Sequence, residues 1–300
     1  MRMRRVGVVR RVLVGSACAA VALGVAPAAA GASSAATAGC GSTLSEREVN
    51  SIAALSDTST LTGSPMRRLE DAIERHHRIT DILMRHRDRR GLFLIGLDLS
   101  EQRAVMPLQR DPAAFAHPDY AHAVSLELAR RILVNFHGEF ASGAVEPHWA
   151  QYFSLAADCG VSGARVAMAG YNAHLTVDLT YSVAAVGARP EDAGDHFKIV
   201  DGIARVGLPI IDRTKAAYGV DIGPLWRFYF LGEGLDRLVG QGVATGPMLE
   251  AADDGYNVTV FGNGLALQNP TVHDATVAEI RTLYQSNETA FDVLARLGGL

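Results

Sequence analysis

The sequence predicts an all-α protein, a single-domain helical bundle packed around a buried central helix at residues 161–187. That stretch is long enough for about seven helical turns, and its only ionisable residues are Arg165, His174 and Asp178. A helix that is apolar on all sides is typical of a protein interior. Amphipathic helical patterns precede and follow it, and only residues 91–100 have the pattern of a strand or an extended connector.

The chain has 300 residues, of which 48% are hydrophobic and 20% charged, and this composition fits one large globular domain. Residues 1–30 have the charged, apolar and small-residue order of a secretory signal. We expect a flexible tail at 31–43 and one helical domain at 44–300. Arg10 and Arg11 directly precede the apolar run, so twin-arginine export is an alternative to the general route. Either route leads to secretion, and no transmembrane segment is expected after cleavage.

Charge argues against a nucleic-acid partner. The predicted signal contains five arginines and no acidic residue, so the chain that follows it has a formal net charge of −9. Binding of phosphate backbones needs a basic surface. We therefore expect a small-molecule substrate or ligand.

Two cysteines, Cys40 and Cys159, remain after the signal, which itself contains Cys18. In an exported protein a pair of this kind predicts one disulfide. Two free thiols are the alternative, and Cys40 in the TAGC sequence is also compatible with lipid attachment.

Before the central helix, we expect helices over residues 66–90, 118–136 and 148–159. The first carries the tandem pair His76 and His77. Adjacent helical residues point about 100° apart, so the two imidazoles do not share one metal, and we place both on a solvated charged face.

After the central helix, the next predicted helix carries His196 on its apolar, inward face and Asp201 on its solvated face. A further helix begins at Pro224. Residues 262–270 have a loop-like composition, and residues 272–297 form a last amphipathic helix.

The candidate site lies on the central helix. His174 and Asp178 are four residues apart, which places them on one helical face one turn apart. A buried imidazole and a buried carboxylate both need partners. We therefore predict His174 and Asp178 as catalytic residues, with Asn172 and Glu233 as further candidates.

A metal site is one interpretation of these residues. His174, Asp178 and His196 would supply three ligands, and Asp192, Glu233 or water would supply the fourth. One divalent zinc or manganese ion fits such nitrogen and oxygen ligands. In the metal-free alternative, Asp178 fixes the tautomer of His174, and the dyad acts as a general acid or base. A satisfied polar pair without chemistry is also compatible with the spacing.

Aromatic residues on the central helix and on the helix after Pro224 predict the walls of an apolar pocket. These predicted pocket residues are Tyr171, Tyr181, Trp226, Tyr229 and Phe230.

The segment AGYNAHLTVDL at 169–179, with DPAAFAHPDYAHAV and HWAQYF before it and DHFKIVDGI after it, resembles an actinobacterial family of unknown function. The resemblance covers roughly residues 106–237. It implies a single helical domain with a site at Asn172, His174 and Asp178, and it implies no reaction. The His-x-x-x-Asp spacing is also distantly similar to helical zinc-dependent phospholipase C and nuclease folds, whose fuller ligand set is not visible in the sequence.

From these observations we expect a secreted enzyme, specifically a metal-dependent hydrolase that acts on an apolar or lipid-like small substrate. A cofactor-independent isomerase or cyclase that uses the histidine and aspartate dyad is the first alternative. A secreted, non-catalytic binding protein for a hydrophobic ligand is the second.

Overall fold

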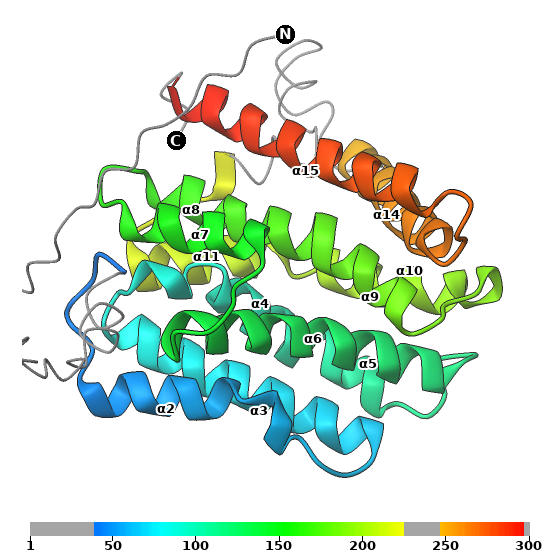
Figure 1. The fold of residues 1–300 in the computed structure, drawn as a ribbon, viewed down its shortest axis with the longest axis horizontal. Helices are drawn as coiled ribbons and strands as arrows, with labels where there is room; N and C mark the ends of the chain where they lie inside the picture. The colour runs from blue at the N-terminus through cyan, green and yellow to red at the C-terminus, as the bar shows by residue number, and fades with distance from the viewer. Residues whose placement is uncertain (1–38, 225–246, 297–300) are drawn as a thin grey trace, which may run out of the picture.

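The computed structural model describes residues 39–224 and 247–296. Within these residues the chain is helical, contains no strand, and forms a single helical domain. The helices stack in layers, with the first helices of the chain at one side, the last two at the opposite side, and the central helix between them (Figure 1). The predicted all-α class is therefore confirmed.

The first layer is formed by α2, α3 and α6, which pack on one another. Their bounds are Glu46–Ser56, Pro65–Arg85 and Pro118–Phe140. Ser45 begins α2 through a capping box with Glu48, and Ser64 with Pro65 begins α3. These side chains satisfy backbone N–H groups that have no partner inside the helix, so the start of each helix is encoded locally.

Within this layer, η1 (Thr58–Thr60) connects α2 to α3 and contacts α6. Beside the layer lies a second group of short helical segments. They are η2 (Arg89–Gly91), α4 (Leu94–Ser100), the π-helical η3 (Glu101–Val105) and α5 (Met106–Arg110). The predicted strand or connector at residues 91–100 is therefore wrong. Leu92, Phe93, Leu94 and Ile95 are all buried, and a short apolar run buried on all sides has no periodicity that separates strand from helix.

The central helix is a continuous right-handed segment made of three parts. These are α8 (Gly163–Asn172), the π-helical η4 (Ala173–Asp178) and α9 (Leu179–Ala185), preceded by α7 (Pro147–Ala157). Every residue from Ala164 to Asn172 is buried. The prediction of a buried central helix is confirmed, whereas its π-helical turn was not predicted.

The remaining helices are η5 (Pro190–Asp192), α10 (Ala193–Ala204), α11 (Gly207–Tyr218), α14 (Pro247–Leu267) and α15 (His273–Arg296). Of these, α14 and α15 pack on the central helix, α11 packs on α4, and α10 packs on α14 and η3. Helix α14 packs on α9, and α15 packs on α8 (Figure 1). Most of the predicted loop at 262–270 is wrong, because residues 262–267 continue α14. The close approach of Gly264 to Val183 leaves no space for a side chain at that position, so this glycine serves helix packing rather than a turn.

The core is aromatic where α4, α7 and α8 meet. The ring of Phe93 lies 5.5 Å from that of Trp149 and 5.3 Å from that of Tyr171, both at steep interplanar angles. Such edge-to-face contacts add to the energy of burying the rings. They fix the start of α7 against the central helix, which is where the candidate site lies.

Cys40 and Cys159 form a disulfide, as predicted. The bridge links the segment before α2 to the connection between α7 and α8. The predicted signal at residues 1–30 lies outside the described residues. Among the helices that the structure describes, none is long and apolar enough to cross a membrane.

The three residues predicted at the surface have different outcomes. Asp201 is exposed, as expected. His76, by contrast, is buried, and its Nδ1 atom lies 2.7 Å from Glu101 Oε1. His77 is half-exposed, and its Nδ1 atom lies 2.9 Å from Asp98 Oδ1. The placement of His76 on a solvated face is therefore wrong.

Candidate functional site

Asp178 is the last residue of η4 and is fully buried between α7 and the central helix. Its Oδ1 atom lies 3.0 Å from His148 Nε2, and its Oδ2 atom accepts a hydrogen bond of 2.9 Å from Trp149 Nε1. Burial raises the pKa of Asp178 because it disfavours the charged form, and the nearby Glu146 carboxylate adds to the increase. A cation beside Asp178 would stabilise its charged form.

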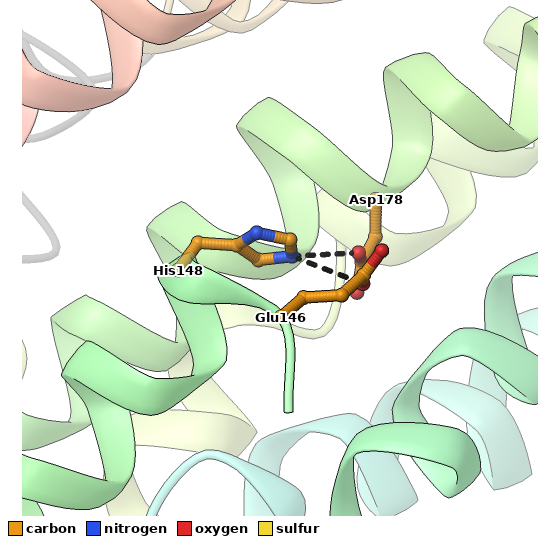
Figure 2. A group of neighbouring side chains, drawn as sticks. All are labelled: Glu146, His148 and Asp178. Carbon is orange, nitrogen blue, oxygen red and sulfur yellow. Dashed lines mark hydrogen bonds and ion pairs between the residues drawn. The ribbon is translucent and has the colours of Figure 1, made fainter. Parts of the chain in front are cut away.

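Glu146 and His148 reach this carboxylate from the start of α7. Pro147 occupies the first turn of that helix, which is a favoured position for proline, so its two neighbours in sequence lie at the helix N-terminus. His148 Nε2 is 3.6 Å from Glu146 Oε2 and 3.0 Å from Asp178 Oδ1 (Figure 2). A single imidazole nitrogen thus contacts both carboxylates.

Asn135, in α6, holds the glutamate in place. Its Oδ1 atom accepts a hydrogen bond of 2.8 Å from the Glu146 backbone N–H, and its Nδ2 atom donates one of 3.0 Å to Glu146 Oε2. Trp149 orients Asp178 in the same way, because its indole N–H donates a hydrogen bond to Asp178 Oδ2. Each carboxylate is therefore oriented by a buried neighbour, as is usual around metal ligands.

Glu146, His148 and Asp178 could hold a metal ion. One ligand atom from each lies within 4.8 Å of the other two, and the set of one nitrogen and two oxygen donors suits zinc or manganese. The Asp178 side chain is fully buried, His148 is mostly buried, and Glu146 is 45% exposed. Because the group is open on the glutamate side, an ion held there would have positions left for water or a substrate. We call these three residues the metal-ligand group.

The metal-ligand group opens into a cleft of about 420 Å³. Glu146 and His148 form part of its wall. We call this cleft the outer cleft. Its wall also includes Arg131, Gln151, Val177, Tyr181, Ile280, Arg281, Tyr284 and Gln285. Its wall therefore combines apolar and aromatic surface with two arginines.

The structure separates His174 from Asp178. His174 lines another cavity, of about 100 Å³, and its ring lies 5.1 Å from that of Phe93. The physical reason is the π-helical turn, in which backbone hydrogen bonds join residues five apart, so residues four apart no longer lie one above the other. No hydrogen bond joins His174 to Asp178 among the described residues, where His148 and Trp149 are the partners of the aspartate.

His196 lines the same cavity as His174 and is buried, as expected for an inward-facing residue. Its Nδ1 atom lies 3.1 Å from the Tyr120 hydroxyl group. We call this cavity the inner cavity. Its walls are mainly apolar residues of α4, α6, α10 and the central helix.

The predicted ligand set of His174, Asp178 and His196 is therefore not assembled in the described part of the chain, where Asp178 belongs to the metal-ligand group instead. Asp192 was proposed as a fourth ligand, and its Oδ1 atom lies 2.7 Å from His117 Nδ1. The other proposed fourth ligand, Glu233, lies outside the described residues.

Asn172 belongs to neither cavity. Its Nδ2 atom donates hydrogen bonds to Glu288 Oε1 and to the Tyr284 carbonyl group, at 2.8 and 3.0 Å, and its Oδ1 atom accepts one from Thr176. In this structure Asn172 joins the central helix to α15. Its predicted catalytic role has no support from these contacts.

Two of the predicted pocket residues lie in different places. Tyr171 lines the inner cavity and Tyr181 lines the outer cleft. The remaining predicted wall residues, which lie outside the described residues, are Trp226, Tyr229 and Phe230.

Sequence reasoning did not identify Glu146 or His148 as site residues. The pair stands on either side of a proline in the sequence EPHW, which is readily interpreted as nothing more than a helix start. The usable signal is that a carboxylate and an imidazole at a helix N-terminus precede the most apolar helix of the chain, with its single aspartate.

Comparison with protein families gives a match that covers residues 69–241. The matching model is described as a family of unknown function, DUF5995, and the match spans more than half of the chain. The chain belongs to the DUF5995 family. The match includes the metal-ligand group and both histidines of the inner cavity. A search of curated proteins and a search of solved structures found no match to this DUF5995 chain.

Proposed function

We propose that this DUF5995 protein is a metal-dependent hydrolase whose ion is held by Glu146, His148 and Asp178. The observation that carries the proposal is the convergence of ligand atoms from these three residues within 4.8 Å, with Glu146 and His148 at the wall of a cleft of about 420 Å³. Three protein ligands with open positions are typical of catalytic rather than structural zinc sites.

A divalent ion held there would polarise a carbonyl or phosphoryl group and lower the pKa of a water molecule. The residues of the chain position this chemistry. Trp149 fixes the Asp178 carboxylate, and Asn135 fixes Glu146. Glu146 is the most exposed of the three ligands, so water and substrate would reach the ion from its side, through the cleft.

For the substrate we propose an amphiphilic small molecule, within the apolar or lipid-like class expected from the sequence. Val177, Ile280 and the rings of Tyr181 and Tyr284 offer apolar contact area. Arg281 is exposed at the wall, and a guanidinium group is suited to a carboxylate or phosphate group. We therefore favour an ester or phosphoester that carries an apolar chain.

The proposal includes export from the cytoplasm. The Cys40–Cys159 disulfide supports it, because structural disulfides are typical of exported proteins. The secretory signal predicted at residues 1–30 remains a prediction.

The test is metal content measured beside turnover. Purified protein is stripped with a chelator, reloaded with zinc or manganese, and examined by elemental analysis. The variants are Asp178→Asn, His148→Gln and Glu146→Gln, with folding checked by circular dichroism. Glu70→Gln is the matched control, because Glu70 is a carboxylate that pairs with Arg110, and neither residue belongs to the metal-ligand group or lines the outer cleft.

We expect about one ion per wild-type and control chain, and at least a tenfold loss of metal affinity in each folded variant, as for the removal of a ligand or its orienting partner. Hydrolysis of p-nitrophenyl butyrate or bis(p-nitrophenyl) phosphate should fall with the metal. Folded variants that keep the ion, or a wild type that takes up none, would contradict the proposal.

The same experiment separates the alternatives. A metal-free wild type whose turnover depends on His174 would favour a cofactor-independent isomerase or cyclase. A protein that binds hydrophobic ligands and turns none of them over would be a binding protein.

A further inference from the structure

A serine, a histidine and a glutamate form a hydrogen-bonded row where the segment before α2 meets the end of α3. Ser42 Oγ lies 2.9 Å from His86 Nδ1, and His86 Nε2 lies 2.9 Å from Glu48 Oε1. A hydroxyl group, an imidazole and a carboxylate joined in this order are the nucleophile, base and orienting group of acyl-transfer sites. None of the three residues belongs to the metal-ligand group or lines the inner cavity or the outer cleft.

Glu48 determines which nitrogen of His86 carries the proton. Hydrogen bonds from the hydroxyl group and the backbone N–H of Ser45 lower the pKa of Glu48 to about 2, so its carboxylate is ionised at neutral pH. An ionised carboxylate only accepts hydrogen bonds, so His86 donates through Nε2, and Nδ1 of the neutral ring is an acceptor. Nδ1 faces the Ser42 hydroxyl group, for which the His86 carbonyl oxygen at 3.5 Å is a more distant acceptor. The serine therefore has a base within hydrogen-bond distance.

Backbone contacts hold Ser42 against the end of α3. Its N–H donates a hydrogen bond of 2.9 Å to the His86 carbonyl group. A Cβ atom at Gly41 would lie 2.2 Å from the same carbonyl oxygen, so glycine is needed for this close approach. The Cys40–Cys159 disulfide fixes the segment from its other side. The serine and the histidine are thus held together before a substrate arrives, as catalysis requires.

Strained backbone lies on both sides of this contact. Cys40 and Arg87 have φ values of 58° and 50°, in the left-handed region that costs roughly 1 to 2 kcal/mol for residues other than glycine. Cys40 lies two positions before Ser42, and Arg87 directly follows His86. Strained residues of this kind cluster at functional sites, so the strain is a second observation that favours a function for the row.

The row is accessible at its serine end. Ser42 is exposed, whereas the side chains of His86 and Glu48 are 19% and 25% exposed. The backbone N–H of Thr43 donates no hydrogen bond within the described part of the chain. In serine hydrolases the N–H of the residue after the nucleophile often stabilises the oxyanion, and Thr43 offers such a donor.

We propose that Ser42, His86 and Glu48 form a second catalytic site, which hydrolyses small carboxylic esters through an acyl-serine intermediate. Ser42 Oγ bonds to the carbonyl carbon of the ester, and its proton passes to His86 Nδ1. The bond from that carbon to the alcohol oxygen then breaks, and the alcohol leaves with the proton. Water attacks the acyl-serine in the same way, which releases the acid and restores the serine. Glu48 is a positioning residue that fixes the tautomer of His86 and stabilises its protonated form.

The test uses p-nitrophenyl acetate and the full chain in EDTA, which removes any ion from the metal-ligand group. We expect p-nitrophenolate to appear with a burst of about one equivalent per chain, as acyl-enzyme accumulation produces. Mass spectrometry should find an acetyl group on Ser42 and none on the exposed Ser59. Bis(p-nitrophenyl) phosphate has no carbonyl carbon, so it reports on the metal-ligand group and should not be turned over in EDTA.

Variants assign the roles, with folding checked by circular dichroism. Ser42→Ala and His86→Gln should each lower kcat/KM for the acetate at least about 100-fold, and Glu48→Gln at least about tenfold. Glu46→Gln is the matched control and should keep full activity, because Glu46 is an exposed acid in the same first turn of α2 and lies outside the row.

A second measurement separates the positioning role of Glu48 from its role as a helix cap. Side-chain ¹⁵N resonances should place the proton of neutral His86 on Nε2 in the wild type and in Glu46→Gln. The Glu48→Gln variant should lose this preference.

The proposal would be overturned by a folded Ser42→Ala variant with full activity, by an acetyl group found elsewhere but not on Ser42, or by the absence of acetate turnover in EDTA. The last result would leave the metal-ligand group as the one proposed hydrolytic site. A chain that binds no metal but forms the acyl-serine would instead contradict the metal-dependent hydrolase and support the second site.

Discussion

At the residue scale, burial of neutral histidines couples stability to pH. The pKa values of His174 and His196 are lowered in the folded state, to about 3 and about 4, from about 6.5 in the unfolded chain. Between these limits the unfolded state binds more protons than the folded state. Their contribution to the unfolding free energy is therefore fully present above the pKa of the unfolded state, and it is lost as the pH falls below about 6.5.

When the pH falls from 7.5 to 5, the unfolded chain takes up a proton at each of these two histidines and the folded chain does not. We predict that this lowers the unfolding free energy by about 2 kcal/mol for each histidine. The His174→Leu variant should lose less stability over this interval than the wild type, by about that amount. Urea unfolding at the two pH values measures the difference.

The exposed His273 provides the control, because its replacement by Gln leaves both buried rings in place. Equal losses of stability in the wild type and His174→Leu would contradict the lowered pKa of His174.

The spacing of residues in the sequence predicted the position of some of these side chains and not of others. His196 was placed inward by its apolar neighbours on one face of a helix. His76 has the same signal, since Leu69, Ile73, Ile79 and Leu83 share its face and are all buried, but the many charged residues around it obscured the pattern. Glu146 and His148 could not be found by periodicity, because they lie at a helix start and become neighbours of Asp178 only through tertiary packing.

At the element scale, a buried acid anchors α15 to the rest of the domain. Glu288 accepts hydrogen bonds from Arg165 at 2.6 Å, Asn172 at 2.8 Å and Gln151 at 2.8 Å. These partners come from α8 and α7. Arg165 is itself buried, so loss of the acid would leave a buried guanidinium group with Asp292 as its remaining ion-pair partner in the described chain.

We predict that Glu288→Ala lowers the unfolding free energy by about 3 to 5 kcal/mol, the usual cost of removing one partner of a buried ion pair. Glu279→Gln, on the exposed face of the same helix, is the matched control and should change stability by no more than about 0.5 kcal/mol. Denaturant titration measures both, and similar effects of the two substitutions would show that α15 is not anchored in this way.

Helical elements were predicted well where a strong pattern existed. Pro118 marks the start of a helix, as predicted, and the apolar sequence of the central helix indicated its burial. Prediction failed at residues 91–100 and 262–267, where buried apolar or glycine-containing runs carry no periodic signal. The π-helical turn of η4 also has no sequence signature, because it arises from how the central helix packs against its neighbours.

At the scale of the whole molecule, the disulfide joins parts of the chain that are far apart in sequence. Cys40 and Cys159 are separated by 119 positions. In the loop-entropy model, closing a loop of this length stabilises the folded state by roughly 4 to 5 kcal/mol, because the unfolded chain has fewer conformations.

We predict that the double variant Cys40→Ser, Cys159→Ser is less stable than the oxidised protein by several kcal/mol on the same model. Changing both cysteines avoids a free thiol that could pair between molecules. Equilibrium unfolding in urea, compared with the wild type under non-reducing conditions, gives the difference. Equal midpoints would show that the bridge contributes little, and thiol titration of the unfolded, non-reduced wild type should find no free cysteine.

The π-helical turn η4 also determines how the central helix can change in length. On this helix Leu175 and Leu179 face the inner cavity, whereas Val177 lines the outer cleft and Asp178 faces α7. The wide turn holds one residue more than an α-helical turn, so deleting one residue from Ala173–Asp178 would restore α-helical geometry in the segment and leave the helix after it in register. Within the segment, side chains that now line the inner cavity and side chains that now face α7 would then share one face. The extra residue of η4 therefore keeps the two sets of side chains apart.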